Sequence, residues 1–231
     1  MGETSREVYG MDPSRTEDYD ELQIEVIRQR WGQKAERWDT DLAKQDCHLN
    51  EDGAYDRFLT EAEAVIAERA KFCRRSALVD LGCGTGQILA HFIDRFASGV
   101  GVDISPEMLA VAARRQLPRT RLVTGNCFDL ASEVLGGGAV LSRGILLSHY
   151  GPRRAPLLLE QIRRCLIPEG FALIDFLNAS ARHLYPSNPT NKAYFEGREI
   201  RQMARDAGFT WGIILGEPNR RVLMLLAEMG P

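Results

Sequence analysis

Two kinds of hydrophobic pattern follow one another along the chain, and together they predict an α/β fold. Short, almost wholly apolar runs are typical of strands that are buried on both faces of a parallel sheet. Segments in which apolar residues recur every three or four positions are typical of helices. The strands predicted in this way cover residues 77–81, 100–103, 120–124, 139–142, 171–176, 210–215 and 221–227.

Segments with helical spacing separate most of these strands, and their ends carry recognisable signals. Ser105 followed by Pro106 predicts a capped helix start, because serine accepts a bond from the helix backbone and proline is favoured at the first helical position. The last two strands are joined by a short turn at 217–219, so they are predicted to form a hairpin. Further helices are predicted over residues 17–30, 56–72, 152–167 and 198–207.

A glycine turn links the first predicted strand to the helix that follows it. Gly82, Gly84 and Gly86 form a Gly-x-Gly-x-Gly turn, in which the backbone can approach a ligand because no Cβ stands in the way. Asp80 interrupts the strand near its ligand-facing end. Asp103 ends the second strand about 20 residues beyond Gly82, the distance at which an acidic side chain reaches ribose hydroxyls.

This turn does not match the fingerprint of NAD-binding proteins, because Gln87 stands where that fingerprint has its third glycine. The string Val-Asp-Leu-Gly-Cys-Gly-Thr-Gly at 79–86 resembles instead the first motif of the class I S-adenosylmethionine-dependent methyltransferases. The segment VDISPEMLAVAARR at 102–115 resembles their second motif and its helix. Residues 76–115 carry the resemblance, and the order of predicted strands and helices fits it from about residue 55 to the end.

The resemblance implies an enzyme with a doubly wound α/β fold of the Rossmann-like type. Its sheet would be seven-stranded and mostly parallel, with a reversed last strand and helices on both faces. The methyltransferase domain would cover residues 55–231, preceded by an N-terminal helical lid over residues 1–54. The implied cofactor is S-adenosylmethionine.

The family also implies where this cofactor binds. Asp80, Gly82 and Gly84 are expected to hold the ammonium and carboxylate groups of its methionine part, and Asp103 its ribose hydroxyls. The full set of cofactor-binding residues implied by the resemblance is Asp80, Gly82, Cys83, Gly84, Asp103, Ile104, Met108, Asn126, Cys127, Arg143 and Gly144.

Asn126 departs from the family pattern. The family commonly has an acidic residue here, which accepts a bond from the adenine amino group. The side-chain carbonyl of Asn126 can also accept a hydrogen bond, and Asp129 is the alternative acceptor.

Two tryptophans mark the predicted N-terminal helical region. Trp31, Ala35 and Trp38 recur at i, i+4 and i+7, which places them on one helix face. One interpretation is ordinary core packing. The other is a lid over the cofactor in which Trp31 and Trp38 bind substrate, since small-molecule members of the family often begin with an aromatic helix that ends in a Tyr-Asp pair. Trp38 and Asp39 match that pair in part.

Candidates for the acceptor side follow the fourth and fifth predicted strands. His149 and Tyr150 come soon after the fourth strand, where a histidine can take a proton from the acceptor. His183, Tyr185 and Tyr194 lie in the long irregular segment after the fifth strand, where family members place acceptor contacts. Each of the five has an alternative structural role as a residue that anchors a loop.

Composition limits which classes of substrate and which cellular compartment we expect for this protein. A net charge of −3 argues against a nucleic-acid substrate, which usually requires a basic face. The five cysteines have no paired spacing, so free thiols in a reducing cytoplasm and no metal site are expected. No apolar run approaches the roughly 20 residues that span a bilayer, and the N-terminal stretch has no secretory apolar core, so a cytoplasmic protein without a membrane partner is expected.

Absent motifs narrow the reaction further. No Asn/Asp-Pro-Pro-Tyr string follows the fourth strand, which disfavours methylation of amide or nucleobase amino groups, and no Pro-Cys pair is present for methylation at a base carbon. We therefore expect methyl transfer to a nitrogen or oxygen of a small molecule, in the biosynthesis of a specialised natural product. Two alternatives remain open: a methyltransferase for RNA or protein, and a module that binds the cofactor without turnover. The acceptor and the oligomeric state do not follow from the sequence.

Overall fold

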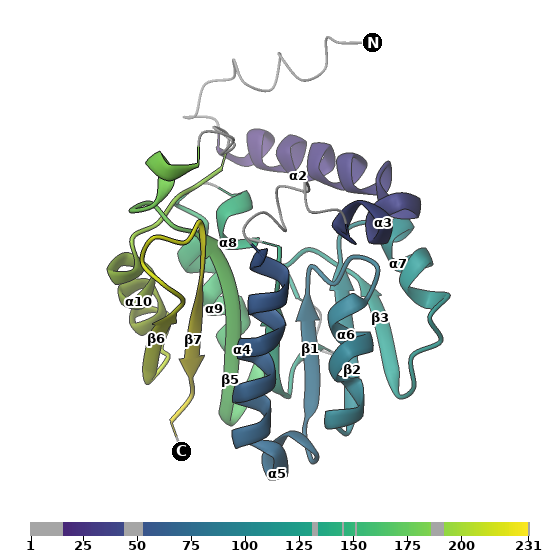
Figure 1. Cartoon of the computed structure of the whole chain (residues 1–231). Coiled ribbons are helices and arrows are strands. Elements are labelled where there is room, and N and C mark those ends of the chain that lie inside the picture. The colour runs from purple at the N-terminus through teal and green to yellow at the C-terminus, as the bar shows by residue number, and fades with distance from the viewer. Residues whose placement is uncertain are drawn as a thin grey trace.

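The computed structural model describes residues 16–43, 53–130, 134–144, 146–150, 152–185 and 192–230. Its centre is a seven-stranded sheet of order β3-β2-β1-β4-β5-β7-β6 (Figure 1). The strands are β1 Ala77–Leu81, β2 Ser98–Asp103, β3 Thr120–Thr124, β4 Gly137–Ser142, β5 Leu166–Leu177, β6 Trp211–Leu215 and β7 Val222–Glu228.

Strand direction confirms the predicted topology. The pairs from β3 to β5 are parallel, whereas β7 is antiparallel to both β5 and β6. β5 starts at Leu166, earlier than predicted, because Leu166 pairs with Gly137 of β4 across an irregular register. The helix predicted over 152–167 accordingly ends at Cys165.

The helices are α2 Thr16–Gly32, α3 Trp38–Ala43, α4 Ala54–Glu68, α5 Ala70–Cys73, α6 Gln87–Phe92, α7 Pro106–Ala113, α8 Leu146–His149, α9 Ala155–Cys165 and α10 Gly197–Asp206, and 3₁₀ turns cover Ala35–Arg37, Ile93–Arg95 and Arg182–Leu184. The single helix predicted over 56–72 is two helices that meet at Arg69. Ser105 caps α7 as predicted, since its hydroxyl accepts the N–H of Met108 at 3.2 Å.

The helices cover both faces of the sheet, as predicted, because alternate strand residues point to opposite sides. On one face, Leu78 belongs to a buried cluster with Phe58 of α4 and Leu89 of α6. On the other, Val79 belongs to a second cluster with Leu159 of α9, and Ile200 of α10 lies in that same cluster. The doubly wound fold therefore leaves the carboxyl ends of the parallel strands as the place for a ligand.

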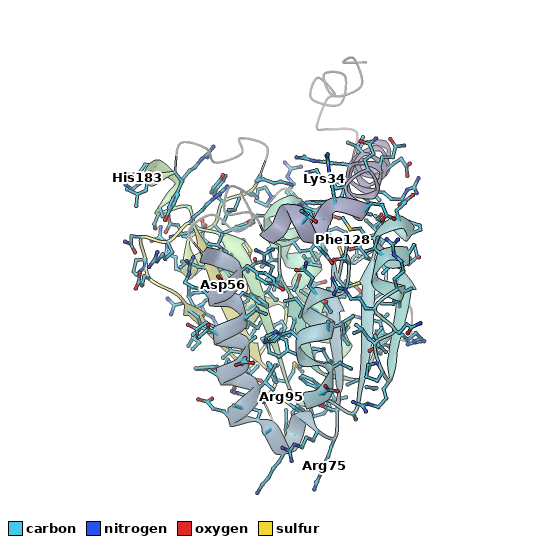
Figure 2. The ribbon with its side chains drawn as sticks, turned by 45° about the vertical axis from the view of Figure 1, so that its right-hand side comes forward. Lys34, Asp56, Arg75, Arg95, Phe128 and His183 are labelled. Carbon is cyan, nitrogen blue, oxygen red and sulfur yellow. The ribbon has the colours of Figure 1, made fainter. Side chains whose placement is uncertain are left out.

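Helices α2 and α3 lie across that end of the sheet (Figure 1). Ile24 and Ile27 of α2 pack against the core cluster below them. Figure 2 shows Lys34 and Phe128 at this end and Arg75 at the other. The predicted boundary at residue 54 remains a prediction, and residues 1–15 and 44–52 of the predicted lid lie outside the described residues. Within the described part of the chain, no helix combines the length and apolar character needed to cross a membrane.

Candidate functional site

The glycine turn after β1 joins the tips of two neighbouring strands. Gly82, Gly84 and Gly86 have φ values of 71°, 53° and 77°, in the left-handed region that favours glycine. The N–H groups of Gly82 and Cys83 both donate to the carbonyl of Val102 in β2, at 2.8 and 3.0 Å. The turn is thus fixed against the second strand, and its remaining backbone faces the space above the sheet.

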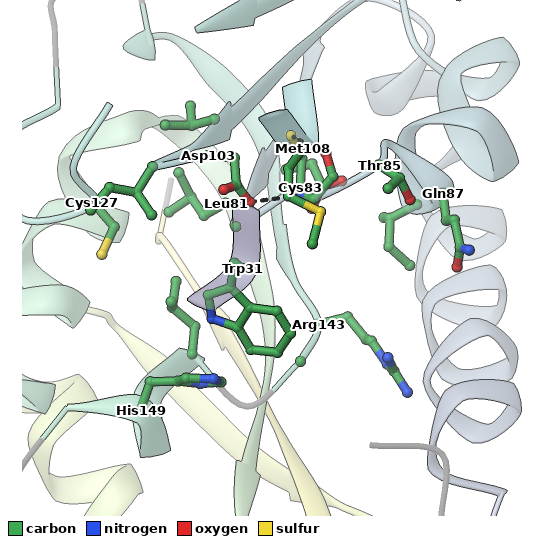
Figure 3. Close-up of a pocket in the computed structure, with 18 of the residues that line it drawn as sticks. Trp31, Leu81, Cys83, Thr85, Gln87, Asp103, Met108, Cys127, Arg143 and His149 are labelled. Atoms are coloured by element: carbon green, nitrogen blue, oxygen red, sulfur yellow. Dashed lines mark hydrogen bonds between the residues drawn. The ribbon is translucent and has the colours of Figure 1, made fainter. Parts of the chain in front are cut away.

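Asp103, at the end of β2, holds this turn from the other side. Its Oδ2 accepts the N–H of Gly84 at 2.8 Å (Figure 3), and its Oδ1 accepts the N–H of Ser105 at 2.9 Å. Burial raises the pKa of Asp103, and these backbone hydrogen bonds act in the opposite direction. The carboxylate is therefore rigidly oriented, and each oxygen keeps a lone pair for a ligand donor.

Asp80, near the end of β1, is the most unusual charged residue of the site. Its side chain is only 1% exposed, and its Oδ2 has no hydrogen-bond partner in the described structure. Burial, and then the negative charge of Asp103, raise the pKa of Asp80 to about 8. A buried carboxylate in this state favours a cationic ligand, because a positive charge would offset the cost of its desolvation.

A pocket lies above these residues and holds about 980 Å³ of empty space, the solvent at its mouth included. The predicted site residues that line it are Asp80, Gly82, Cys83, Gly84, Asp103, Ile104, Met108, Cys127, Arg143, Gly144, Trp31, Trp38, His149 and Tyr150. Residues from the strand tips, the N-terminal helices and α8 thus meet in one cavity.

Four predicted residues lie outside the pocket wall. Asn126 is engaged locally, because its Oδ1 accepts the N–H of Phe128 at 3.1 Å, and its neighbours Gly125 and Cys127 line the pocket in its place. His183 is exposed on a 3₁₀ turn (Figure 2), and the hydroxyl of Tyr185 donates to the carbonyl of Asn219 at 3.3 Å.

Tyr194 is the fourth predicted site residue that lies outside the pocket wall. The guanidinium of Arg182 lies 4.4 Å from its ring centroid, and the ring packs against a small cluster that includes Leu177 and Val222. Its contacts, like those of Tyr185, fit a residue that anchors the loop.

Two tryptophans and a histidine form the upper wall. The rings of Trp31 and Trp38 meet edge to face, with centroids 5.1 Å apart. The ring of Trp31 lies 5.8 Å from that of His149, at an interplanar angle of 53° (Figure 3). Both tryptophans therefore pack on each other and also line the pocket, and their part in a lid that binds substrate stays a prediction.

Tyr150 differs from its neighbour His149. Its side chain is 4% exposed, packs edge to face on Phe128 at 4.7 Å and shares a hydrogen bond with Cys127. Burial, followed by its interaction with Cys127, raises the pKa of Tyr150, so the phenol keeps its proton at neutral pH. It can orient other groups, but it is poorly suited to act as a base.

Some residues of the pocket did not follow from the sequence analysis. Tyr55 lines it from the first turn of α4, and Arg143 lies over the Tyr55 ring at 4.5 Å. The helix that precedes β1 runs in the opposite direction to it, so the start of the helix lies at the end of the sheet where β1 finishes. This connection indicates in the sequence that Tyr55 lies near the pocket. Ile27, Thr85, Gln87 and Leu146 also line the pocket.

Comparisons with known proteins agree with this geometry. Residues 78–170 match the family described as "Methyltransferase domain". The matched stretch contains the glycine turn and Asp103 and spans less than half of the chain. Among curated relatives, a trans-aconitate 2-methyltransferase of Deinococcus radiodurans is 40% identical to this chain over 75 residues. The aligned residues cover 32% of this chain and 28% of that protein.

A second relative is the dTDP-3-amino-3,6-dideoxy-α-D-glucopyranose N,N-dimethyltransferase of Streptomyces fradiae, 28% identical over 131 residues, or 55% of this chain and 49% of that protein. The chain therefore spans about half or less of the length of these two curated relatives.

Solved structures share the methyltransferase fold. Magnesium protoporphyrin IX methyltransferase from Synechocystis, with bound S-adenosylhomocysteine, matches with a TM-score of 0.68 at 16% identity, over 89% of this chain and 99% of that one. The 1,6-didemethyltoxoflavin-N1-methyltransferase of Burkholderia thailandensis, with its acceptor and S-adenosylhomocysteine bound, matches with a TM-score of 0.62 at 21% identity, over 89% and 88%. The predicted fold class is confirmed, and the predicted cofactor agrees with what these methyltransferase structures hold.

Proposed function

We propose that this chain transfers a methyl group from S-adenosylmethionine to a nitrogen or oxygen atom of a small molecule. The observation that carries the proposal is the buried carboxylate of Asp80, one oxygen of which has no partner within the described structure. A buried charge of this kind is costly unless a ligand satisfies it. The ammonium group of the cofactor's methionine part is a cation of suitable chemistry.

Two further side chains of the pocket fit the other polar groups of the cofactor. Arg143 brings a guanidinium to the pocket wall beside Tyr55, and a guanidinium is well suited to bind the carboxylate of the methionine part. Asp103 offers carboxylate oxygens to the ribose hydroxyls, in an orientation that Gly84 and Ser105 fix. Opposite charges at Asp80 and Arg143 thus match the two charges of an amino acid.

The chain's own residues mainly position the reactants. When bound, S-adenosylmethionine supplies an electrophilic methyl carbon on a positively charged sulfur, so the protein needs no nucleophile of its own. Trp31 and Trp38 line the pocket with apolar rings, which would shield a bound cofactor from water. His149, beside Trp31, is our candidate for the group that takes a proton from the acceptor.

A small-molecule acceptor in the biosynthesis of a natural product is the finer part of the proposal. The two curated relatives described above act, by their names, on trans-aconitate and on a dTDP-linked amino sugar, both small molecules that carry negative charge. The net charge of −3 supports an acceptor other than a nucleic acid.

Calorimetry and a methylation assay test the proposal together. S-adenosylhomocysteine should bind the wild-type protein, and Asp103→Asn should weaken this binding at least tenfold, because a charged hydrogen bond to ribose is worth roughly 1.5–3 kcal/mol. Asp94→Asn, at an exposed position on a 3₁₀ turn, is the matched control and should bind normally. Equal affinities in the two variants would contradict the assignment of Asp103.

The assay uses radiolabelled S-adenosylmethionine with three kinds of acceptor: amino-sugar nucleotides, tricarboxylates and bulk tRNA. Transfer to a small molecule supports the proposal, whereas transfer to tRNA alone would favour the RNA alternative. Tight cofactor binding without any transfer across a broad panel would favour a binding module.

A further inference from the structure

Lys192 is held beside the helix that carries His149. The N–H of the next residue, Ala193, donates to the carbonyl of Ser148 in α8 at 2.9 Å. Ser148 precedes His149, and its hydroxyl in turn accepts the N–H of Leu177 at the end of β5. The backbone at Lys192 is therefore fixed next to the wall of the pocket where the acceptor is expected.

The side chain of Lys192 is half-buried and lies in a field of like charge. Burial, and then the positive charges of Arg30 and Lys34, lower the pKa of Lys192 to about 7. Arg30 belongs to the last turn of α2, and Lys34 follows that helix. We call Arg30, Lys34 and Lys192 the basic cluster. Among the residues that the structure describes, neither Lys192 nor Arg30 forms an ion pair with a carboxylate.

The basic cluster adjoins the pocket through Trp31. The ammonium of Lys34 lies 5.1 Å from the centroid of the Trp31 ring, and the same ring lies 5.8 Å from His149. Figure 2 shows Lys34 at the end of the molecule where the strand tips and the pocket lie. The cations thus come from two chain segments, the end of α2 on both sides of Trp31 and the segment at Lys192 that is bonded to α8.

Gathering like charges and burying one of them is unfavourable unless an anion compensates. An ordinary solvated surface does not explain the arrangement, because the Lys192 side chain is half-buried. The chain as a whole is acidic, with a net charge of −3, so three cations gathered at one place are not explained by its overall composition. Strongly perturbed ionisable groups beside a pocket are typical of functional sites.

We propose that the basic cluster binds an anionic group of the methyl acceptor, a carboxylate or a phosphate, at the mouth of the pocket beside Trp31 and His149. The inference rests on the proposed function and deepens it, since it assigns the acceptor to the class of small anions. An acceptor held there by its negative group would have the remainder of the molecule directed into the pocket that Trp31 and His149 line.

Anion binding to the complex with S-adenosylhomocysteine tests this inference. Citrate and inorganic pyrophosphate serve as probes for the carboxylate and phosphate cases, and glucose as a neutral probe of similar size, each titrated by calorimetry. We expect at least one of the two anions to bind and glucose not to bind. The tighter of the two anions identifies the chemistry of the acceptor's negative group.

Variants locate the binding site. Lys192→Met should weaken anion binding at least tenfold, whereas Lys192→Arg, which keeps the charge, should retain most of it. The matched control is Lys71→Met, because Lys71 is an exposed lysine on α5 at the opposite end of the sheet (Figure 1). All three variants should bind S-adenosylhomocysteine within twofold of the wild type, which also shows that they fold.

Proton uptake provides a second readout. An anion favours the charged form of Lys192, so binding at pH 8 should take up protons and give a heat that depends on the buffer, and Lys192→Met should abolish this dependence. Equal anion affinity in Lys192→Met and Lys71→Met would overturn the inference, as would wild-type protein that binds S-adenosylhomocysteine but neither anion. A wild-type protein that fails to bind S-adenosylhomocysteine would contradict the proposed function instead, and the anion titrations on that cofactor-free protein would still decide the inference.

Discussion

The side chain of Gln87 donates a hydrogen bond of 2.8 Å to the carboxylate of Asp39, and this bond ties helix α3 to the start of helix α6. The same carboxylate accepts the hydroxyl of Thr85 and pairs with Arg115, whose Nε donates to the carbonyl of Thr85 at 2.6 Å. Gln87 is also the residue that replaces the third glycine of the NAD fingerprint. In this chain, the glycine turn is therefore used to hold the N-terminal helices over the pocket.

Removing the charge of Asp39 should loosen these helices. In Asp39→Asn, we expect faster amide hydrogen exchange over residues 16–43 and a severalfold weaker affinity for S-adenosylhomocysteine, because one side chain joins α3 to three partners. In the wild type, adding this ligand should slow exchange in the same region.

Glu36→Gln is the matched control for Asp39→Asn. Glu36 pairs with Arg114 at 2.8 Å between two largely exposed side chains, so its loss should change little. Identical exchange of residues 16–43 with and without ligand would show that these helices are a permanent part of the core and do not act as a lid.

Gly84→Val should block the cofactor without unfolding the protein. A Cβ on Gly84 would stand in the pocket, 3.8 Å from Nε1 of Trp38 and 3.9 Å from Sδ of Met108, and the two methyl groups beyond it would fill the space that a ligand needs. We expect calorimetry to show at least a hundredfold loss of affinity for S-adenosylhomocysteine.

Gly136→Val separates this effect from backbone strain. Gly136 also has a positive φ, of 91°, and no atom lies within 4 Å of where its Cβ would be, so valine there is strained but far from any ligand. Both variants should lose stability, and only Gly84→Val should lose binding. Normal binding by a folded Gly84→Val protein would mean that the turn does not face the cofactor.

His149→Gln should lower the rate of methyl transfer while the affinity for S-adenosylhomocysteine stays within twofold. General-base assistance is worth roughly a hundred- to ten-thousandfold in rate. The measurement is kcat and KM with whichever acceptor of the panel is methylated. His91→Gln is the control, because His91 is a partly exposed histidine that contacts Glu63 at 3.2 Å.

Whether the substitution changes kcat or KM identifies the role of His149. A large fall in kcat supports a base, whereas a large rise in KM with an unchanged kcat would make His149 an acceptor-binding residue. Wild-type values of both would make it a structural residue.

The pKa of Asp80 predicts how the stability of the cofactor-free protein depends on pH. Burial raises this pKa from its usual 3.8 to about 8, so between these values the folded protein binds more protons than the unfolded chain. The stability contributed by the protonated group is complete below the lower value and is lost as pH rises through about 8. Asp80→Asn removes this loss, so thermal melts at pH 8 should show the variant to be more stable than the wild type, and melts at pH 5 should show a much smaller difference. A constant difference across this range would contradict the raised pKa.

The strands, and the position of the glycine turn beside Asp103, could be predicted because short-range rules encode them. Positive φ at Gly84 requires glycine, and an acidic side chain at the tip of the second strand has a fixed distance from the turn in this fold. Both features are visible as spacing in the sequence, and the structure brings Asp103 and the glycine turn together at the pocket, while their role in cofactor binding stays a prediction.

The adenine contact expected of Asn126 and the acceptor side could not be predicted in the same way, because they depend on loop geometry and on contacts between distant segments. The side-chain carbonyl of Asn126 accepts the N–H of Phe128 within its own turn. This local hydrogen bond competes with a ligand, and the spacing of hydrophobic residues does not predict it. The hydroxyl of Tyr185 donates a hydrogen bond to the carbonyl of Asn219, which lies in another loop. Lys192 gains its unusual environment only when the chain brings it beside Arg30, far away in sequence.

The central claim is that the carboxylate of Asp80 receives a positively charged part of the cofactor, and proton release on binding tests it most directly. At pH 7, a group with a pKa of about 8 is mostly protonated, and a bound ammonium would favour its ionised form. Binding of S-adenosylhomocysteine should therefore release protons, measured as a calorimetric heat that differs between phosphate and Tris buffers in proportion to their ionisation enthalpies. The account predicts this release for the wild type and its loss, with weaker binding, in Asp80→Asn. Tight binding by the wild type with the same heat in both buffers would contradict it.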